Sequence, residues 1–462
     1  MNHCKIYKNI ILLYINIMGG GLIQLAAIGA QNAYLSGNPQ ITYFVAVYKR
    51  HTNFSIECIE QLFTGNATFG KKVFCDINRV GDLIGDIFLV VKLPKLYSSV
   101  NDKAVISWTN SIGHALIKYI DIEIGETIVD KQYGIWLQIW SELTVDASRR
   151  EAFNMMIGKK DNFYNTLEAE EMNLYIPLYF WFCNNPGLAL PLIALQNHVV
   201  RINLGIRDLG ELWVSEDGTP PDNIEITSCS LYVDYIFLDD TERVFFAQNT
   251  HNYLISQLQI SSNALDASRI YKCRKEDTTI CIECDEEEQV NEDYVLIRKS
   301  NKGDTTMVDL KFNHPVKELI WIIQNSDILE MANGKGNDWF NFSDKPFGCP
   351  DGSEQCDPMI QAKLILDGVD RMEDRDAKYF RLVQPFQRHT CVPANNYIYV
   401  YSFGYNPEKY QPSGTLNFSR IDNSIFEISI VGGIKRPVLQ MFATNYNILR
   451  IMGGMAGVVY NN

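Results

Sequence analysis

Short apolar or alternating segments recur along the chain and limit it to folds built mainly from β-strands. In Tyr119–Ile124, every second residue from Ile120 onward is apolar, so one face of a strand would be buried and the other solvated. Clusters of Gly, Pro, Asn and Asp between such segments favour turns. The other segments of this kind are Ile87–Leu93, Ile117–Ile124, Val199–Leu204, Ser230–Leu238, Leu319–Ile323, Ala362–Leu366, Tyr397–Phe403 and Ile425–Val431. Many short strands separated by turns are typical of β-sandwiches and barrels.

Helical signals are few. The best is Ile135–Leu143, in which Ile, Trp and Leu residues recur at helical spacing along one stripe. It lies in a long insertion, roughly 130–175, that also holds the polar stretch Lys159–Glu171. We expect this insertion to be a loop with short helices at one end of a sandwich.

A diverged internal duplication is visible in the order of the strand-like segments. Three pairs occur in the same order in the two halves: Ile84–Lys92 with Val316–Gln324, Val200–Leu204 with Thr415–Ser419, and Tyr232–Leu238 with Ala443–Leu449. Each match alone is weak, because apolar strands resemble one another by chance. The shared order predicts two copies of one fold, with a boundary near Asp239–Arg243, where charged residues interrupt the apolar pattern.

Length and composition agree with two packed domains. The chain has 462 residues, more than a single core usually supports, and 46% of them are hydrophobic. We expect an N-terminal extension and arm over 1–42, a first domain over 43–240, a linker over 241–252 and a second domain over 253–462. The formal net charge of −14 disfavours direct binding to nucleic acid. Eleven scattered cysteines indicate reduced thiols in a cytosolic setting.

The N-terminal region combines several motifs. Lys5 and Lys8 precede an apolar run that imitates a signal peptide but is too short to span a membrane. Three glycines from Gly19 predict an arm over 19–38 that lies outside both sandwiches, and Ser36–Pro39 is a turn signal. The β-branched and aromatic run Ile41–Tyr48 predicts a strand.

These motifs carry a family resemblance. Met18–Gly21, Gly37–Thr42 and Tyr48–Phe54 together closely resemble the N-terminus of the major capsid proteins of nucleocytoplasmic large DNA viruses, of the iridovirus and phycodnavirus kind. Further matching segments are Tyr235–Gln248, Phe312–Trp321, Tyr401–Arg420, Asn445–Arg450 and Gly453–Gly454. The match spans about 18–460. Translation is therefore expected to start at Met18, or residues 1–17 to be dispensable.

The resemblance implies an all-β fold of two tandem eight-stranded jelly-roll sandwiches, a double jelly roll with short helices in loops. It implies a structural protein that trimerises into a pseudo-hexagonal capsomer of an icosahedral virus shell. The implied partners are other copies of the chain, minor capsid proteins and, through the arm, an internal viral membrane. The implied location is the virion capsid, assembled in the host cytoplasm. The insertion 130–175 and Tyr401–Gly414 are candidates for the trimer contacts.

Candidate catalytic and metal motifs fail on inspection. Gly65–Lys72 nearly matches a phosphate-binding loop, but Lys72 replaces the Ser or Thr that would hold magnesium, and a strand-like segment follows, so a hairpin turn is favoured. Cys273, Cys281 and Cys284 lack a suitably spaced fourth zinc ligand, and the acidic run Asp285–Glu288 follows directly, which favours a mobile loop with free thiols.

The remaining polar residues show no catalytic pattern. The aspartates at 367, 370, 374 and 376 do not match a calcium loop and are read as solvated turn residues, and the seven histidines are dispersed. We therefore expect no catalytic, cofactor-binding or metal-binding residues, no cofactor and no enzyme activity. Two alternatives remain open: a carbohydrate-binding jelly-roll protein, and an assembly scaffold of the same family.

Overall fold

The computed structural model describes most of the chain and divides it into two compact units, Met1–Asn53 and Phe54–Asn462. The described residues are 20–101, 103–161, 163, 167, 170–215, 217–265, 269–274, 281–284, 294–299, 305–329, 336–345, 355–432, 434 and 436–460. For the strands between 269 and 299 the description covers the backbone pairing but not the side chains. No helix among these residues is long and apolar enough to cross a membrane.

The described part of the first unit contains only short helices. They are α2 (Gly20–Ala26), η1 (Ala30–Asn32) and α3 (Ala33–Ser36), and every residue from 20 to 53 is exposed. The predicted strand Ile41–Tyr48 is wrong, because these residues form no strand. Its composition favours a strand, but a strand also needs a neighbour to satisfy its backbone groups, and none pairs with this segment.

The second unit begins with a jelly roll made of two antiparallel sheets. One sheet has the order β1 (Phe54–Leu62), β11 (Ser228–Leu238), β3 (Leu83–Leu93), β7 (Met172–Pro177). The other has the order β2 (Lys72–Asp76), β9 (Val200–Ile206), β5 (Ile117–Ile124), β6 (Thr127–Gln132). Most predicted strands of this half lie within these elements.

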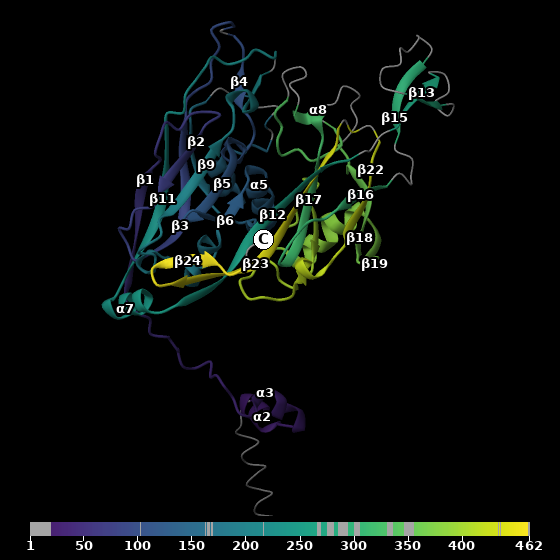
Figure 1. Cartoon of the computed structure of the whole chain (residues 1–462). Coiled ribbons are helices and arrows are strands. Elements are labelled where there is room, and N and C mark those ends of the chain that lie inside the picture. Colours follow the sequence, from purple (N-terminus) through teal and green to yellow (C-terminus); the bar gives the residue numbers. More distant parts are fainter. Residues whose placement is uncertain are drawn as a thin grey trace, which may run out of the picture. The chain divides into compact units, whose positions relative to one another are not determined.

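A second jelly roll follows (Figure 1). One sheet has the order β12 (His251–Ala264), β23 (Val438–Met452), β17 (Pro315–Gln324), β20 (Tyr399–Ser402). The other has the order β16 (Thr306–Asp309), β22 (Ser424–Ile430), β18 (Met359–Leu366), β19 (Val369–Asp376). Strand by strand, this is the order of the first roll, which confirms the predicted duplication.

Two of the three predicted segment pairs are equivalent in the fold, and one is wrong. β3 and β17 occupy the same place, as do β11 and β23. The counterpart of β9 is β22, however, not Thr415–Ser419. That segment contains β21 (Leu416–Asn417), which pairs with the start of β17 just as β8 (Leu190–Pro191) pairs with the start of β3. Short apolar strands are too alike for sequence alone to separate neighbours.

Smaller elements complete the unit. The additional strands are β4 (Ile106–Trp108), β10 (Trp213–Ser215), β13 (Arg269–Arg274), β14 (Cys281–Cys284), β15 (Tyr294–Lys299) and β24 (Met455–Val458). The α-helices are α4 (Ile112–Leu116), α5 (Gly134–Thr144), α6 (Arg150–Ile157), α7 (Asp240–Gln248), α8 (Ser326–Leu329) and α9 (Gln384–Arg388). The π-helix η8 (Tyr379–Val383) precedes α9, and 3-10 turns are η3 (Trp181–Cys183), η4 (Pro186–Leu188), η5 (Leu192–Ala194), η6 (Leu209–Glu211) and η9 (Phe418–Arg420).

Two of these helices match sequence signals. The predicted helix Ile135–Leu143 is confirmed as α5. Between the two rolls, α7 begins after Asp239, whose carboxylate accepts a hydrogen bond from the Asp240 backbone. The charged run that suggested a boundary therefore forms the N-cap and first turn of a helix between β11 and β12.

Strand β17 shows how the two rolls are joined. Nine of its ten residues are buried. Leu319, Trp321 and Ile323 pack into the core of the second roll, whereas Ile320 and Ile322 belong to a larger core that is continuous with the first roll. Successive side chains of a strand point to opposite faces, so both faces of this strand are covered. That explains the unbroken apolar run Leu319–Ile323 within it.

Candidate functional site: the seam between the two jelly rolls

The inter-roll seam is defined here as the buried contact between the second roll's β12, β17 and β23 and the first roll's β6 and α5. Helix α5 supplies its aromatic centre: the rings of Trp136 and Trp140 stack with centroids 5.3 Å apart. The ring of Trp136 also lies 5.5 Å from that of Phe442 on β23. Cys391 of the second roll donates its backbone NH to Leu143 O at 2.8 Å. The helical stripe seen in the sequence therefore supplies one of the contacts that hold the two rolls together.

Strands β6 and β12 add polar contacts to the seam. The carboxylate of Asp130 accepts hydrogen bonds from the backbone NH of Leu258 at 3.0 Å and from Nε2 of Gln132 at 2.9 Å. Burial raises the pKa of Asp130 to about 6, although these hydrogen bonds oppose the shift. Gln132 also donates to Tyr179 O at 2.8 Å. This carboxylate thus ties the edge of the first roll to the first strand of the second.

Further contacts join the rolls near β10. Asn337 donates through Nδ2 to Gly210 O and Trp213 O, both at 3.0 Å, and its own carbonyl accepts from Thr109 Oγ1 at 2.6 Å. The guanidinium of Arg207 lies 3.7 Å above the ring centre of Trp339. Burial lowers the pKa of Arg207 to about 10.

Next to α5, the second roll contains a buried histidine between two carboxylates. His389 Nε2 lies 3.0 Å from Glu318 Oε2, and its Nδ1 lies 2.8 Å from Glu408 Oε1. Burial alone would lower the pKa of His389, but the charges and hydrogen bonds of both glutamates raise it to about 9. The imidazole is therefore cationic at neutral pH. Its ring meets Trp140 edge-on at 6.4 Å.

Lys317 is a second buried cation on this face. Its Nζ donates to Ser256 Oγ at 3.1 Å and to Pro407 O at 3.3 Å, and it lies 5.1 Å from the centre of the Tyr446 ring. Burial lowers its pKa, and the neighbouring Glu318 opposes that shift. Each of these charges has a partner, as buried charges require.

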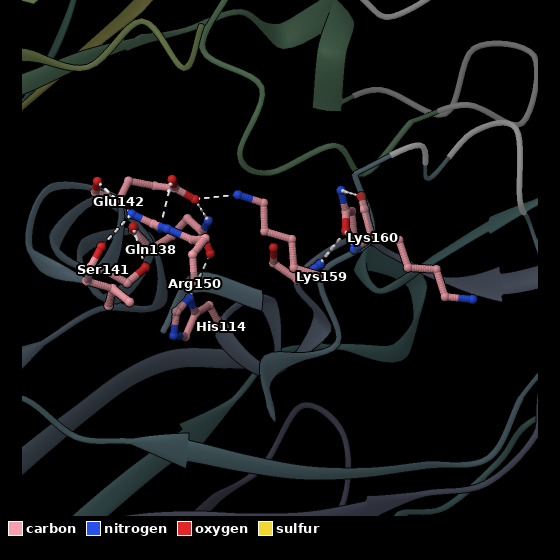
Figure 2. A network of polar contacts seen from close by, with 10 residues as sticks. His114, Gln138, Ser141, Glu142, Arg150, Lys159 and Lys160 are labelled. Atoms are coloured by element: carbon pink, nitrogen blue, oxygen red, sulfur yellow. Dashed lines mark hydrogen bonds and ion pairs between the residues drawn. The ribbon is translucent and has the colours of Figure 1, made fainter. Parts of the chain in front are cut away.

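The opposite side of α5 is anchored by the polar network in Figure 2. His114 on α4 donates through Nδ1 to Gln138 Oε1 at 2.7 Å, and Gln138 Nε2 donates to Glu142 at 2.8 Å. Arg150 Nη1 lies 3.0 Å from Glu142, which also pairs with Lys159. Burial lowers the pKa of His114 to about 4, so this imidazole is neutral. The network fixes α5 within the first roll and so positions Trp136 and Trp140.

A pocket of about 260 Å³ opens along the seam. Aromatic rings form much of its wall, and polar groups from both rolls complete it. Its lining includes Asp130, Gln132, Trp136, Trp140, Tyr179, Trp181, Ser256, Lys317, Glu408 and Tyr410.

The segment that resembles a phosphate loop is a turn. Gly65 and Gly70 have positive φ angles of 98° and 74°, which glycine adopts readily. Thr64 and Phe74 form an isolated bridge, and β2 starts at Lys72. A strand rather than a helix follows Lys71, so no helix N-terminus is present to bind phosphate. The turn interpretation is confirmed.

The cysteine and aspartate interpretations need correction. Cys273 lies in strand β13, opposite Cys281 of strand β14, which also contains Cys284. The prediction that these cysteines lie in a loop is therefore wrong. Their side chains and Asp285–Glu288 lie outside the described residues. Of the aspartates, 370, 374 and 376 lie on strand β19 rather than in turns. Asp367 is in the turn, where its carboxylate accepts from the backbone NH groups of Asp422 and Asn423 at 3.1 and 2.9 Å.

The structure brings together residues that the sequence did not single out as a group. Glu318, His389 and Glu408 come from three separate segments, and only tertiary structure makes them neighbours. Within the described part of the chain, no cluster of His, Cys, Asp and Glu is arranged to hold a metal ion.

Comparisons with known proteins agree over both rolls. A family model described as the major capsid protein N-terminus matches residues 42–239. A second, described as the large eukaryotic DNA virus major capsid protein, matches residues 286–457. The major capsid protein of Pyramimonas orientalis virus is 40% identical, and the match covers 96% of this chain and all of that protein. The major capsid protein of Paramecium bursaria Chlorella virus 1 is 34% identical over the same shares.

Solved structures have the same fold. A chain of the PBCV-1 virus capsid superposes with a TM-score of 0.73 at 30% identity, and the match covers 91% of this chain and all of that one. The Faustovirus major capsid protein gives a TM-score of 0.69 at 13% identity, covering 92% and 94%, which supports the fold alone. The chain therefore belongs to the major capsid proteins of large eukaryotic DNA viruses, structural proteins of the virus capsid that have the double jelly-roll fold.

Proposed function

We propose that three copies of this chain close into a pseudo-hexagonal trimer that tiles an icosahedral shell. The observation that carries this proposal is that one chain holds two rolls with the same strand order. Three chains then place six similar walls around a threefold axis. In such a ring the second roll of one chain meets the first roll of the next by heterologous contacts.

The seam within the chain offers a template for the contact between chains. In the first roll, α5 lies on the connection between β6 and β7 and packs on the second roll. In the second roll, the equivalent connection, between β19 and β20, carries η8 and α9. Phe386 on α9 is 81% exposed and Val383 is 40% exposed. By analogy with α5, this connection is the surface that would pack on the first roll of the next chain.

This surface is proposed in addition to the two segments that the sequence favoured for the trimer contact. In the insertion 130–175, α5 is buried inside its own chain, with Trp136 and Leu143 almost inaccessible. In Tyr401–Gly414, Glu408 and Tyr410 line the inter-roll pocket, whereas Tyr405 is 69% exposed. We therefore add Tyr405 to Phe386 and Val383 as the proposed contact.

The arm and the domain boundaries complete the proposal. The arm over 19–38 would contact neighbouring capsomers, minor capsid proteins or an internal membrane, since Leu25 and Tyr34 are at least 70% exposed. Domains over 43–240 and 253–462, with a linker over 241–252, fit sheets that use residues 54–238 and 251–458 separately. Assembly in the host cytoplasm, and the absence of enzyme activity, remain part of this proposal.

The decisive experiment is the mass of the purified protein by light scattering. One chain has a mass of 52.8 kDa, so a trimer has a mass of about 158 kDa (3 × 52.8). A permanent contact of ~2,000 Å² or more would keep this mass unchanged on dilution to micromolar concentration. Phe386→Asp should shift the mass toward one chain, whereas Val100→Asp, in an equally exposed loop of the first roll, should not. A stable monomer in the wild-type protein would contradict the proposed trimer.

A further inference from the structure

We propose that the inter-roll pocket binds a neutral polyhydroxylated ring, one monosaccharide unit of a free sugar or of a glycan. The pocket's volume of about 260 Å³ corresponds to roughly nine waters at ~30 Å³ each, which is room for one such ring. This inference concerns a small-molecule site and does not depend on the oligomer.

Two buried polar atoms at the pocket lack partners within the described part of the chain. They are the indole Nε1 of Trp181 and the carboxamide Oε1 of Gln132, and both residues line the pocket. Trp181 is 2% exposed and Gln132 is 3% exposed. A buried donor or acceptor without a partner is costly, so such groups usually meet a ligand or a bound water. A ligand hydroxyl that reached these two buried atoms could accept a hydrogen bond from the indole NH and donate one to the carboxamide oxygen.

The aromatic wall of the pocket also requires a ligand with an apolar face that can pack on the rings. Trp136, Trp140, Tyr179 and Tyr410 line the same hollow, and Trp136 and Trp140 stack on each other. The C–H face of a sugar ring packs on such rings, while its hydroxyls reach the polar groups around them. A site with apolar walls and a few placed polar groups is typical of small-molecule pockets.

The charges in the wall favour a neutral ligand over a cation. Asp130 already accepts hydrogen bonds on both oxygens, from Leu258 and Gln132. Glu408 accepts from His389 and Thr390. Lys317 and Lys409 also line the pocket and balance these two carboxylates. With two carboxyl and two amino side chains in the described lining, the wall has no excess of acidic groups to select a cation.

Saturation-transfer NMR on the intact protein tests the proposal. The probes are glucose, galactose and mannose, their methyl glycosides, and tetramethylammonium as a cation of similar size. We expect at least one sugar to show transfer and tetramethylammonium to show none. Binding of the methyl glycoside as well as the free sugar identifies a glycan unit as the ligand, and binding of the free sugar alone identifies a free sugar.

Two variants locate the site. Trp181→Phe keeps an aromatic ring but removes the free NH, and should weaken sugar binding about fivefold. Tyr410→Ala, at a half-exposed residue that should not affect folding, should weaken it about tenfold. Trp339→Phe is the matched control, because its NH donates to Glu211 O away from the pocket. The proposal is overturned if no sugar binds, if tetramethylammonium binds instead, or if a bound sugar is insensitive to both pocket variants.

Discussion

His389 and Glu318 form an ion pair at 3.0 Å in which both side chains are completely excluded from solvent. Glu318 lies on β17, at the centre of its sheet, and also accepts a hydrogen bond from Thr444 Oγ1 at 3.2 Å. Glu408 supplies the second carboxylate. His389 also contacts Trp140 of the first roll. The ion pair of the second roll therefore lies directly against the inter-roll seam.

The pair predicts that stability falls at alkaline pH. The pKa of His389 is about 9 in the folded chain against 6.5 for an unperturbed histidine. The stabilisation is therefore complete below about pH 6.5 and is lost as pH rises to about 9, a change on the order of 3 kcal/mol. Thermal unfolding of the wild type and of His389→Gln between these values should show the difference between them shrinking.

Lys317 changes stability with pH in the opposite direction, and its contribution must be separated from that of His389. Its pKa is lowered in the folded chain, so its contribution to stability increases toward the unfolded value of 10.5. Because the wild type and His389→Gln both contain Lys317, its contribution cancels in the difference between their stabilities. A constant difference between wild type and His389→Gln across this range would show that His389 is neutral in the fold.

Removing one charge of the pair should destabilise the second roll. Glu318→Gln keeps the shape of the side chain but leaves His389 with Glu408 alone, and breaking a buried pair costs about 3–5 kcal/mol. We expect a Tm roughly 10 °C lower by calorimetry. Glu373→Gln, on β19 with a side chain 80% exposed, is the control and should change Tm by less than about 2 °C. Equal Tm values for the two variants would contradict a charged pair.

The seam itself should contribute strongly to stability. Trp136→Ala removes the ring that packs on Trp140 and Phe442, and loss of a buried Trp costs about 3–5 kcal/mol. Tyr97→Ala, at a residue 60% exposed in the first roll, should stay within about 0.5 kcal/mol of the wild type. Chemical denaturation followed by fluorescence measures both, and a neutral Trp136→Ala would mean that the rolls are held together elsewhere.

The arm should matter for assembly but not for folding. Deleting residues 1–38 should leave soluble trimers with an unchanged Tm that assemble poorly into particles in electron micrographs. Deleting only residues 1–17 is the control and should have no effect. Particles of normal number and shape from the longer deletion would remove the arm from the assembly contacts.

Nucleotides should not bind the turn between β1 and β2. Lys71→Ala should leave assembly unchanged, and ATP should not shift the Tm, because a ligand that binds the native state would raise it. The variant serves as the control for any shift in the wild type. A shift that disappears in Lys71→Ala would reinstate a nucleotide site.

Local sequence pattern predicted individual elements better than their partners. The stripe on Ile135–Leu143 indicated a helix with one buried face, but not that Trp136 and Trp140 face a second roll. The apolar run of β17 indicated a strand, while its burial on both faces depends on which roll covers it. Ile41–Tyr48 has strand composition and no partner strand. His389, Glu318 and Glu408 are distant in the chain, and no local pattern marks residues that only the fold makes neighbours.

The exposed apolar residues of the arm have a consequence for how errors in a shell are corrected. Residues 20–38, the described part of the arm, bury none of their side chains. A contact that immobilises the arm against a neighbour costs conformational entropy, so each contact is weaker than its apolar area would give. Weak single contacts let a wrongly placed unit leave before its neighbours fix it. In a growing lattice with such arms, wrongly placed units would dissociate and bind again. The lattice would become stable only once many arms are covered together.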